Sequence, residues 1–413
     1  MVDNFMSPDA RVVILGAGHA GGSAVAFLRQ FGFAGPITLI GDEPHAPYQR
    51  PPLSKAWLKG EADANSLMLK PASFYVEQNI DLRLSVQATA IDRAAKTVTL
   101  SDGNRLDYDV LVIATGARAR RLPIPGADLY GVLELRNASD AEKLKTAIGP
   151  GKRLAVVGGG YVGLEVAASG RALGADSVVI ERESRVLARV ACPALSNFFQ
   201  DYHGRQGVEF VLNAGVEAFV GDEGKVTGVR LSDGRVIACD AAVVGVGAIP
   251  NDDIAAAAGL TLDGGIVVDE QARTSDPAIF AIGDVTRRPL PLYGRMHRLE
   301  SVPNALEQAK QVASALTGRK APPPEVPWFW SDQYDLKLQI AGIPFDADRI
   351  VIRGKVETAK FAVFHLKGQQ LVAVEAVNAP PEFMAGKMLI SNGKAVDPDK
   401  LANDTVSMKE VAA

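Results

Sequence analysis

Short, wholly apolar runs recur along the chain between longer segments of mixed polarity. Two of these runs, Val12–Leu15 and Leu154–Val157, are each followed by a glycine-rich turn and then by a stretch with helical spacing of apolar residues. A strand that is buried on both faces of a parallel sheet is apolar throughout, so each run predicts the first strand of a β-α-β unit. The predicted fold class is therefore α/β, with two doubly wound dinucleotide-binding domains.

The first predicted unit begins at residues 11–42 and continues through further predicted strands at Val98–Leu100 and Asp109–Ile113. It lacks a closing strand, and we expect residues 276–283 to supply it. The second dinucleotide-binding domain would then be inserted into the first. Four short runs between residues 336 and 374 predict an antiparallel sheet in a C-terminal α+β domain. The predicted divisions are 1–117 and 247–322 for the first domain, 118–246 for the second, and 323–413 for the C-terminal domain.

The two glycine-rich turns have the same plan and start 142 positions apart (158 − 16). They read Gly16-Ala-Gly18-His-Ala-Gly21 and Gly158-Gly-Gly160-Tyr-Val-Gly163. Glycines allow a sharp turn and a close approach of backbone amides to a pyrophosphate, which rests on a helix N-terminus. An acid follows each second strand and accepts a hydrogen bond from ribose: Asp42 or Glu43 in the first unit, Glu181 in the second. A chain that holds two dinucleotides is expected to move electrons between them.

Composition excludes several other classes of protein. The net charge of −4 argues against general binding to nucleic acid, which depends on an excess of Lys and Arg. Residues 1–11 hold two acids and no apolar core, which argues against a signal or transit peptide. No apolar run is long enough for a membrane span. We therefore expect a cytoplasmic protein with neither nucleic-acid nor membrane partners.

The cysteines and histidines carry no recognisable motif. The two cysteines, Cys192 and Cys239, are isolated and form no Cys-x-x-Cys pair, so a disulfide reductase is not expected. We expect both to be buried as small apolar residues. The five histidines have no ligand spacing, and no metal is assigned. Electrons would have to leave for a separate acceptor.

On its motifs, the chain resembles the FAD-dependent, NADH-oxidising ferredoxin reductases that serve bacterial Rieske oxygenases and haem-thiolate monooxygenases. Besides the two glycine turns, the motifs are Pro47-Tyr-Gln-Arg-Pro-Pro-Leu-Ser-Lys55, Ala114-Thr-Gly116, Ala281-Ile-Gly-Asp284, Glu300-Ser-Val-Pro-Asn-Ala305 and Trp328-Phe-Trp-Ser-Asp-Gln-Tyr334. The resemblance implies a glutathione reductase-like arrangement, with FAD on the first turn and NADH on the second.

The resemblance also implies which residues bind the cofactors. They are Gly16, Gly18, His19, Ala20, Gly21, Asp42, Arg50, Lys55, Ala88, Ala114, Thr115, Gly116, Arg136, Gly158, Gly160, Tyr161, Val162, Gly163, Glu181, Gly247, Gly283, Asp284, Ser301, Val302, Ala305 and Trp330. Of these, Tyr161 is expected to cover the flavin until nicotinamide displaces it.

Lys55 and Glu165 are the predicted catalytic residues, because in the family they pair near the nicotinamide. By sequence alone, Lys55 is equally well explained as a solvated lysine, and Glu165 can be placed on an exposed helix face. Glu181 predicts NADH rather than NADPH, since a carboxylate repels a 2′-phosphate. Arg182 and Arg185 lie close by and would favour the phosphate instead.

The predicted function is an NADH-dependent reductase that passes electrons through FAD, one at a time, to a two-iron, two-sulfur ferredoxin serving a monooxygenase or Rieske dioxygenase. Alternatives are a rubredoxin reductase, an NADH oxidase, or a redox-gated interaction protein resembling apoptosis-inducing factor. The last would require a targeting presequence and a basic nucleic-acid face, for which the sequence gives no sign.

Overall fold

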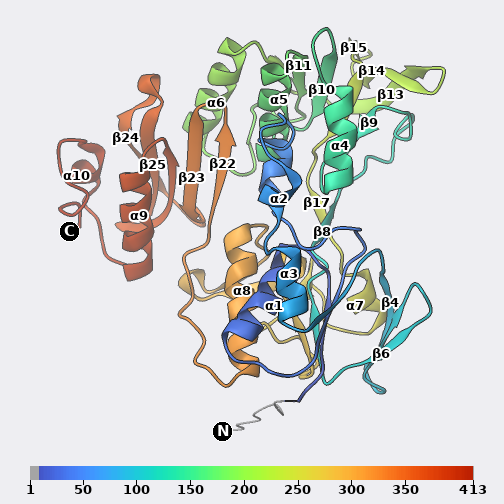
Figure 1. Ribbon diagram of the computed structural model, residues 1–413. Coiled ribbons are helices and arrows are strands. Elements are labelled where there is room, and N and C mark those ends of the chain that lie inside the picture. Colours follow the sequence, from blue (N-terminus) through green and yellow to red (C-terminus); the bar gives the residue numbers. More distant parts are fainter. Residues whose placement is uncertain (1–8, 413) are drawn as a thin grey trace. The chain divides into compact units, whose positions relative to one another are not determined.

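The structure, a computed structural model, describes residues 9–412 (Figure 1). The expectation about a signal or transit peptide in residues 1–11 falls mostly outside this range. The chain forms two compact units. The first unit comprises residues 1–49, 64–118 and 249–328, and the second comprises 50–63, 119–248 and 329–413. The predicted four-part domain division remains a proposal beside this grouping.

A five-stranded parallel sheet, in the order β19-β7-β1-β2-β3, organises the first unit. Its strands are β1 (Val12–Leu15), β2 (Ile37–Ile40), β3 (Ile80–Arg83), β7 (Val110–Ile113) and β19 (Ile279–Ala281). Residues Ile279–Ala281 pair in parallel with Leu111–Ile113. The closing strand therefore comes from the distant segment that the sequence predicted.

Two helices of the first unit share one apolar core with this sheet. They are α1 (His19–Gln30) and α8 (Val302–Leu316), and their core residues include Leu28 and Val312, packed with Ile14 and Phe280. The other face of the sheet, with Val13 and Leu111, packs on a second cluster. Other helices and strands of this unit are α2 (Ala64–Leu67), α3 (Ala72–Glu77), β4 (Ala88–Asp92), β5 (Thr97–Leu100), β6 (Arg105–Asp107), α7 (Asp253–Ala257), β18 (Ile266–Val267), β20 (Thr286–Leu290) and β21 (Arg295–His297).

The second unit has its own five-stranded parallel sheet, in the order β12-β11-β10-β16-β9. Its strands are β9 (Val132–Leu133), β10 (Arg153–Val157), β11 (Asp176–Ile180), β12 (Glu209–Val211) and β16 (Ala241–Val244). Helices α4 (Ala138–Ala147), α5 (Tyr161–Ala172) and α6 (Pro193–Arg205) accompany it, with a three-stranded sheet of β13 (Val216–Asp222), β14 (Lys225–Leu231) and β15 (Val236–Ala238). Between residues 118 and 151 the chain adds β9 to this sheet and forms α4, whose N-terminus has a capping box on Asn137.

The C-terminal part of the second unit contains a five-stranded sheet in the order β22-β23-β26-β25-β24. Its strands are β22 (Trp328–Gln333), β23 (Leu336–Gly342), β24 (Arg349–Lys355), β25 (Lys360–Lys367) and β26 (Gln370–Val377), and α9 (Pro380–Asn392) and α10 (Pro398–Ala402) follow. The pairs β23–β26, β26–β25 and β25–β24 are antiparallel, as predicted. The chain passes between the units at five points, and three of these lie within β8 (Ala117–Ala119), β17 (Ala248–Pro250) and β22.

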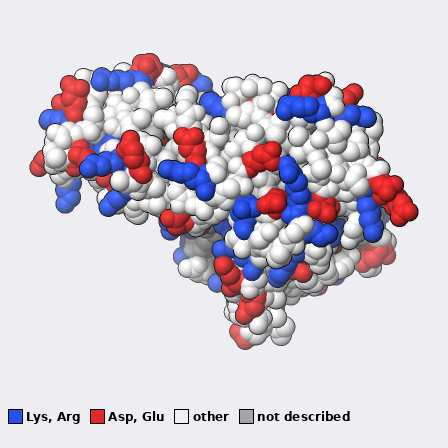
Figure 2. Space-filling model, turned by 90° about the horizontal axis from the view of Figure 1, so that it is seen from above, with Lys and Arg blue, Asp and Glu red and all other residues white. Residues whose placement is uncertain are grey.

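The predicted fold class is confirmed by this architecture. On the face shown in Figure 2, basic and acidic side chains are intermingled. Within residues 9–412, the structure contains no helix with the length and apolar character needed to cross a membrane.

Candidate active site

The first glycine turn joins β1 to α1 and leaves no space for a side chain at Gly16 or Gly21. Gly16 has φ +111°, and a Cβ there would lie 2.2 Å from the carbonyl oxygen of Ala114. A Cβ on Gly21 would lie 2.0 Å from the carbonyl oxygen of Gly16. Gly18 is the N-cap of α1, with no side-chain capping bond, and His19 and Ala20 begin the helix. The turn therefore presents backbone amides at a helix N-terminus, which suits a pyrophosphate.

Two acids follow β2, at the position where a ribose is expected. Asp42 is exposed, whereas Glu43 is half-buried and accepts a hydrogen bond of 2.5 Å from the Tyr48 hydroxyl. Glu43 is thus held by the protein, and Asp42 is the more accessible carboxylate. The assignment of ribose binding to Asp42 stays a prediction.

The predicted Gly283-Asp284 turn is bound to α8. Gly283 has φ +81°, and a Cβ there would lie 2.9 Å from Cβ of Ala20. The Gly283 amide donates to Oε1 of Gln308 at 2.8 Å, and Thr286 donates to the same oxygen at 3.0 Å. The sequence analysis missed Gln308, which is fully buried and connects the turn to the helix.

The N-terminus of α8 has a serine cap. The Ser301 hydroxyl accepts a hydrogen bond from the amide of Asn304 at 3.3 Å. Val302 is the first helical residue, and Ala305 is buried in the core below. This end of the helix provides a positive field close to the Gly283 turn.

Three further predicted residues of the first unit lie after β7. Ala114 and Gly116 flank Thr115, whose hydroxyl donates to the carbonyl oxygen of Asn251 at 2.7 Å. The side-chain amide of Asn251 donates back to the carbonyl oxygen of Thr115 at 2.9 Å. Ala88 is half-buried at the start of β4. The reciprocal Thr115–Asn251 pair fixes the loop that the sequence placed against FAD.

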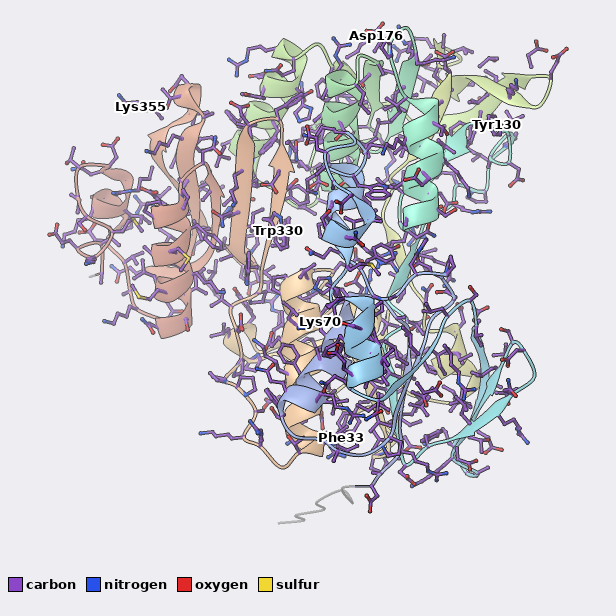
Figure 3. All side chains as sticks on the ribbon, viewed as in Figure 1. Phe33, Lys70, Tyr130, Asp176, Trp330 and Lys355 are labelled. Carbon is purple, nitrogen blue, oxygen red and sulfur yellow. The ribbon has the colours of Figure 1, made fainter. Side chains whose placement is uncertain are left out.

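Arg50 and Arg136, both predicted to touch FAD, belong to the second unit and lie together there. The Arg50 guanidinium donates to the carbonyl oxygen of Arg136 at 2.8 Å. The Arg136 amide donates to Asp140 at the start of α4. Trp330, on β22, is half-buried (Figure 3). Their roles toward a cofactor stay predictions.

The second glycine turn repeats the geometry of the first. Gly158 has φ +106°, and its Cβ would lie 2.5 Å from the carbonyl oxygen of Gly245. A Cβ on Gly163 would lie 2.1 Å from the carbonyl oxygen of Gly158. Gly160 is the N-cap of α5, and Gly247 has φ +108° after β16. This turn also fits a pyrophosphate.

Glu181 lies at the turn, as predicted for the ribose acid. Its Oε2 accepts the Gly159 amide at 2.6 Å, and its Oε1 accepts the Glu183 amide at 2.9 Å. Arg185 is occupied by other groups, since it donates to the Ala191 carbonyl at 2.9 Å, to the Ala188 carbonyl and to the Ser196 hydroxyl. Arg182 is 77 % exposed and pairs with Glu183. Glu181 is therefore the charged group fixed at this turn.

Tyr161 opens α5 and is held within the second unit. Its hydroxyl donates to the carbonyl oxygen of Val190 at 3.2 Å, and its ring packs edge-on against Phe329 at 4.8 Å. Burial raises the pKa of this phenol well above its ordinary value. The next residue, Val162, is 47 % exposed. Movement of Tyr161, as a flavin cover requires, would have to break these contacts.

Lys55 and Glu165 form a tight ion pair. Lys55 follows the 3-10 helix Pro51–Ser54, and Glu165 lies on α5. Lys55 Nζ is 2.6 Å from Glu165 Oε2, and the two side chains are 17 % and 5 % exposed. The alternative interpretations, a solvated lysine and an exposed glutamate, are therefore wrong. The roles of the pair stay predictions.

Two serines complete the surroundings of Glu165, and the sequence analysis missed both. The Ser54 hydroxyl donates to Oε2 at 2.5 Å, and the Ser331 hydroxyl donates to Oε1 at 2.6 Å. The buried carboxylate thus has a donor on each oxygen besides the ammonium. The sequence does hold a signal for Ser331. Side chains alternate between the two faces of a strand, so Ser331 and Gln333 are expected to share one face of β22.

Both cysteines are free and buried, as predicted. Burial raises the pKa of the Cys192 thiol to about 12 and that of the Cys239 thiol to about 11. Neither forms a reactive thiolate at neutral pH. This chemistry does not suit a dithiol redox centre.

Three buried groups of metal-ligand type meet where the sequence assigned no metal. Cys192, His365 and Glu375 place one ligand atom each within 4.8 Å of one another. His365 Nε2 is 3.1 Å from Glu375 Oε2. Spacing along the chain gives no warning of this cluster, because β25, β26 and the residue before α6 each contribute one member.

Comparison with known proteins gives the same assignment across the whole chain. Residues 10–309 match the model of the pyridine nucleotide-disulphide oxidoreductase family, and residues 328–412 match the reductase C-terminal domain. A probable ferredoxin reductase, CtmF, of Castellaniella defragrans is 54 % identical over 98 % of this chain and 100 % of its own length. A rubredoxin-NAD(+) reductase of Pseudomonas putida is 42 % identical over 89 % of this chain and 96 % of its own length.

Among solved structures, the covalent putidaredoxin reductase–putidaredoxin complex matches with a TM-score of 0.95. The sequences are 42 % identical, and the match covers 98 % of each chain. The predicted cofactors, FAD and NAD(H), are those of this family, and both glycine turns have the close backbone approach that a dinucleotide needs. The chain is an oxidoreductase that belongs to the pyridine nucleotide-disulphide oxidoreductase family and carries the reductase C-terminal domain.

Proposed function

We propose that the protein is an NADH-dependent reductase that passes electrons through FAD, one at a time, to a small two-iron, two-sulfur ferredoxin serving an oxygenase. The proposal rests on the family assignment and on the ferredoxin-reductase names of relatives that match over nearly the full length. One structural observation carries it further. Two dinucleotide turns are present, and both cysteines are buried with raised pKa values. Neither cysteine is suited to take up the electrons, so we infer that they leave for an acceptor outside the chain.

FAD, when bound, supplies the conversion between hydride transfer and single-electron transfer. The residues of the first glycine turn would hold its pyrophosphate, with Asp42 and Asp284 on its ribose and ribityl hydroxyls. The capped N-terminus of α8 would favour negative charge on the bound ring system, since a helix N-terminus carries a partial positive charge. The protein contributes positioning and electrostatics rather than acid-base chemistry.

NADH would bind at the second glycine turn, with Glu181 accepting hydrogen bonds from the ribose hydroxyls. The carboxylate is fixed there by two backbone amides, so it cannot swing aside for a 2′-phosphate. Arg185 is engaged elsewhere within the second unit, which leaves Arg182 as the cation able to approach a phosphate. We therefore expect a preference for NADH over NADPH.

Lys55 and Glu165 would act at the nicotinamide. Lys55 supplies a cation whose place is set by the Glu165 carboxylate, and Glu165 supplies an acceptor for the amide of the ring. A low local dielectric strengthens both interactions, since the pair is mostly shielded from water. We expect the pair to orient the donor and to neutralise charge rather than to transfer a proton.

The experiment that tests this function measures NADH oxidation with a panel of oxidised two-iron, two-sulfur ferredoxins from the same genome. We expect one of them to support turnover far above the rate with oxygen alone. A protein that oxidises NADH only with oxygen would instead be an NADH oxidase, and the proposal would fail.

A rubredoxin reductase is the second candidate, because a relative of that name matches most of the chain. The same assay, run with a rubredoxin beside the ferredoxins, separates the two by the ratio of kcat/KM values. A higher value for the rubredoxin would select this alternative. In either case we propose a cytoplasmic location, where the two free thiols would stay reduced.

A further inference from the structure

A continuous chain of buried hydrogen bonds leads from the Lys55–Glu165 pair to His203 on α6 of the second unit. Ser331 donates to Glu165, and Gln333 Nε2 donates to the Ser331 hydroxyl at 3.0 Å. Gln333 Oε1 is 2.7 Å from His203 Nε2. The three supporting residues are nearly inaccessible to solvent, at 1 %, 1 % and 0 % exposure for Ser331, Gln333 and His203. Water therefore cannot replace these contacts without local opening.

We propose that Ser331, Gln333 and His203 are positioning residues, which hold Glu165 in one orientation so that it fixes Lys55. The inference rests on the proposed function, in which the Lys55–Glu165 pair orients the nicotinamide. It gives a role to Ser331 and Gln333, within the Trp328–Tyr334 motif on β22, and to His203 on α6.

The direction of every hydrogen bond in the chain follows from the carboxylate. An ionised carboxylate only accepts, so Ser331 must donate its single hydroxyl proton to Glu165. The Ser331 oxygen is then left as an acceptor, and it accepts a hydrogen bond from Gln333 Nε2. The Gln333 carbonyl is consequently turned toward His203, whose Nε2 must carry the proton. All donors in the chain thus point toward Glu165.

His203 is suited to be the fixed end of the chain. It is enclosed by aromatic rings, including Tyr334 at 5.0 Å and Phe210 at 6.4 Å between ring centroids. Burial lowers the pKa of His203 to about 4, so the ring is neutral near pH 7 and has one N–H to donate. Its Nδ1 has no hydrogen-bond partner among the described residues. The single N–H must therefore serve Gln333.

This chain of hydrogen bonds also explains why β22 carries small and polar residues on its inner face. Ser331 and Gln333 point inward and are buried, whereas their neighbours Trp330 and Asp332 are half-buried. A one-residue shift of the strand would turn Ser331 away from Glu165. The Ser331–Glu165 bond therefore forms only in the observed register of β22, the strand that carries Trp330, which is labelled in Figure 3.

The test compares Ser331→Ala with Ser331→Thr, Gln333→Leu and a matched control, Ser177→Ala. Ser177 is a buried serine of the same unit, 3 % exposed, whose hydroxyl bonds to the Ala167 carbonyl and not to the pair. The first readout needs no turnover. The purified FAD-loaded protein is treated with an amine-acylating reagent, and modification of Lys55 is followed by peptide mass spectrometry.

An ammonium held against a carboxylate is a poor nucleophile, so Lys55 is expected to react slowly in the wild type. Loss of one hydrogen bond to a charged group should raise its acylation rate about tenfold in Ser331→Ala. A smaller rise is expected in Gln333→Leu, and Ser331→Thr and Ser177→Ala should match the wild type within about twofold.

The second readout is the anaerobic rate of flavin reduction by NADH. Misplacement of Lys55 should slow it about tenfold in Ser331→Ala while the Kd of NAD+ changes less than about twofold. If Ser331 served only the stability of the fold, Ser331→Ala would leave this rate unchanged, or it would lower the rate together with the affinity for NAD+ and the thermal stability. If Ser331→Ala does not fold, Gln333→Leu carries both readouts.

The third readout is the tautomer of His203, obtained by NMR of ¹⁵N-histidine-labelled protein and assigned with a His203→Gln variant. We expect the neutral Nε2–H form. The Nδ1–H form would reverse the chain and overturn the inference, as would a Ser331→Ala protein that matches Ser177→Ala in acylation and flavin reduction. A wild type that NADH cannot reduce would refute the proposed function alone, since the acylation result stands without it.

Discussion

Two buried ion pairs, one from each unit, differ in ways that bear on stability and on the proposed function. Arg288 in the first unit grips Glu307 through two bonds of 2.9 Å, and the side chains are 5 % and 7 % exposed. Lys55 in the second unit meets Glu165 through a single bond of 2.6 Å, and Lys55 is 17 % exposed. Both charges of the first pair are shielded from solvent, whereas the lysine of the second pair remains partly accessible to solvent.

The partners of the two acids reinforce this difference. The Arg288 guanidinium donates hydrogen bonds to Asn304 as well as to Glu307, and Glu307 also accepts a hydrogen bond from Gln311. Asn304, Glu307 and Gln311 all lie on α8. Glu165 is held by two serine hydroxyls that leave the lysine able to face a ligand. A planar, bidentate arginine pair suits a fixed scaffold, and a point-charge lysine suits a site that must contact substrate. The comparison teaches that burial of a pair does not by itself indicate catalysis.

The largest expected effect is on stability, from breaking the Arg288–Glu307 pair. Glu307→Ala leaves the Arg288 charge buried without its partner, and it should lower the free energy of unfolding by about 3–5 kcal/mol. Thermal and urea unfolding of the purified variant would measure this. An unfolding free energy within about 1 kcal/mol of the wild type would contradict the structural role given to the pair.

The second effect is on activity. Glu165→Gln should slow flavin reduction by NADH about 100-fold, equivalent to about 2.7 kcal/mol, with a small loss of thermal stability because Lys55 can turn to water. The control is Glu307→Gln. This variant should lose stability, but the fraction of it that folds should reduce flavin at nearly the wild-type rate. If both variants lost activity only in proportion to stability, the contrast between the pairs would not hold.

The third effect concerns pH. The folded-state pKa of His203 lies near 4, below its ordinary value of 6.5, so the unfolded chain binds the extra proton first as pH falls. His203 should therefore contribute a loss of about 2 kcal/mol of stability between pH 7.5 and pH 5. His203→Gln keeps a donor for Gln333 and does not titrate, so its unfolding free energy should fall less over this range. Equal pH dependence in both proteins would refute a neutral, buried His203.

The smallest effect concerns the choice of nucleotide. Glu181→Ala removes the ribose acceptor and the repulsion of a 2′-phosphate, so the ratio of kcat/KM for NADH over NADPH should shrink about tenfold. Arg182→Ala serves as the matched control and should leave NADH kinetics nearly unchanged. A wild type that uses NADPH better than NADH would remove Glu181 from the account.

Much of the fold was predictable because its signals are local. Apolar runs, glycine turns and the Ser301 cap each depend on neighbouring residues, and even the distant closing strand β19 was predicted, because the first sheet lacked an edge. The Lys55–Glu165 pair was expected only through a family resemblance, since the two residues are 110 positions apart.

The unpredicted features are those in which a pattern misleads. Asn304, Glu307, Gln308 and Gln311 follow the i, i+3, i+4, i+7 spacing of a solvent-exposed helix face, yet all four are buried. Their burial is possible because Arg288 and the Gly283 amide donate hydrogen bonds to this group of side chains. The neighbouring residues in the sequence do not identify these two donors. Ser54 and Ser331 are similar, since a serine acquires a role only when the fold brings a carboxylate to it.

The most direct test of the proposed electron route is an anaerobic, two-step stopped-flow measurement on the FAD-loaded protein. NADH should bleach the flavin absorbance faster than NADPH does, and an oxidised two-iron, two-sulfur ferredoxin added next should restore it. About two ferredoxins should be reduced for each NADH consumed, because NADH supplies an electron pair and the ferredoxin accepts single electrons. A flavin that NADH reduces but that no such ferredoxin reoxidises would contradict the account.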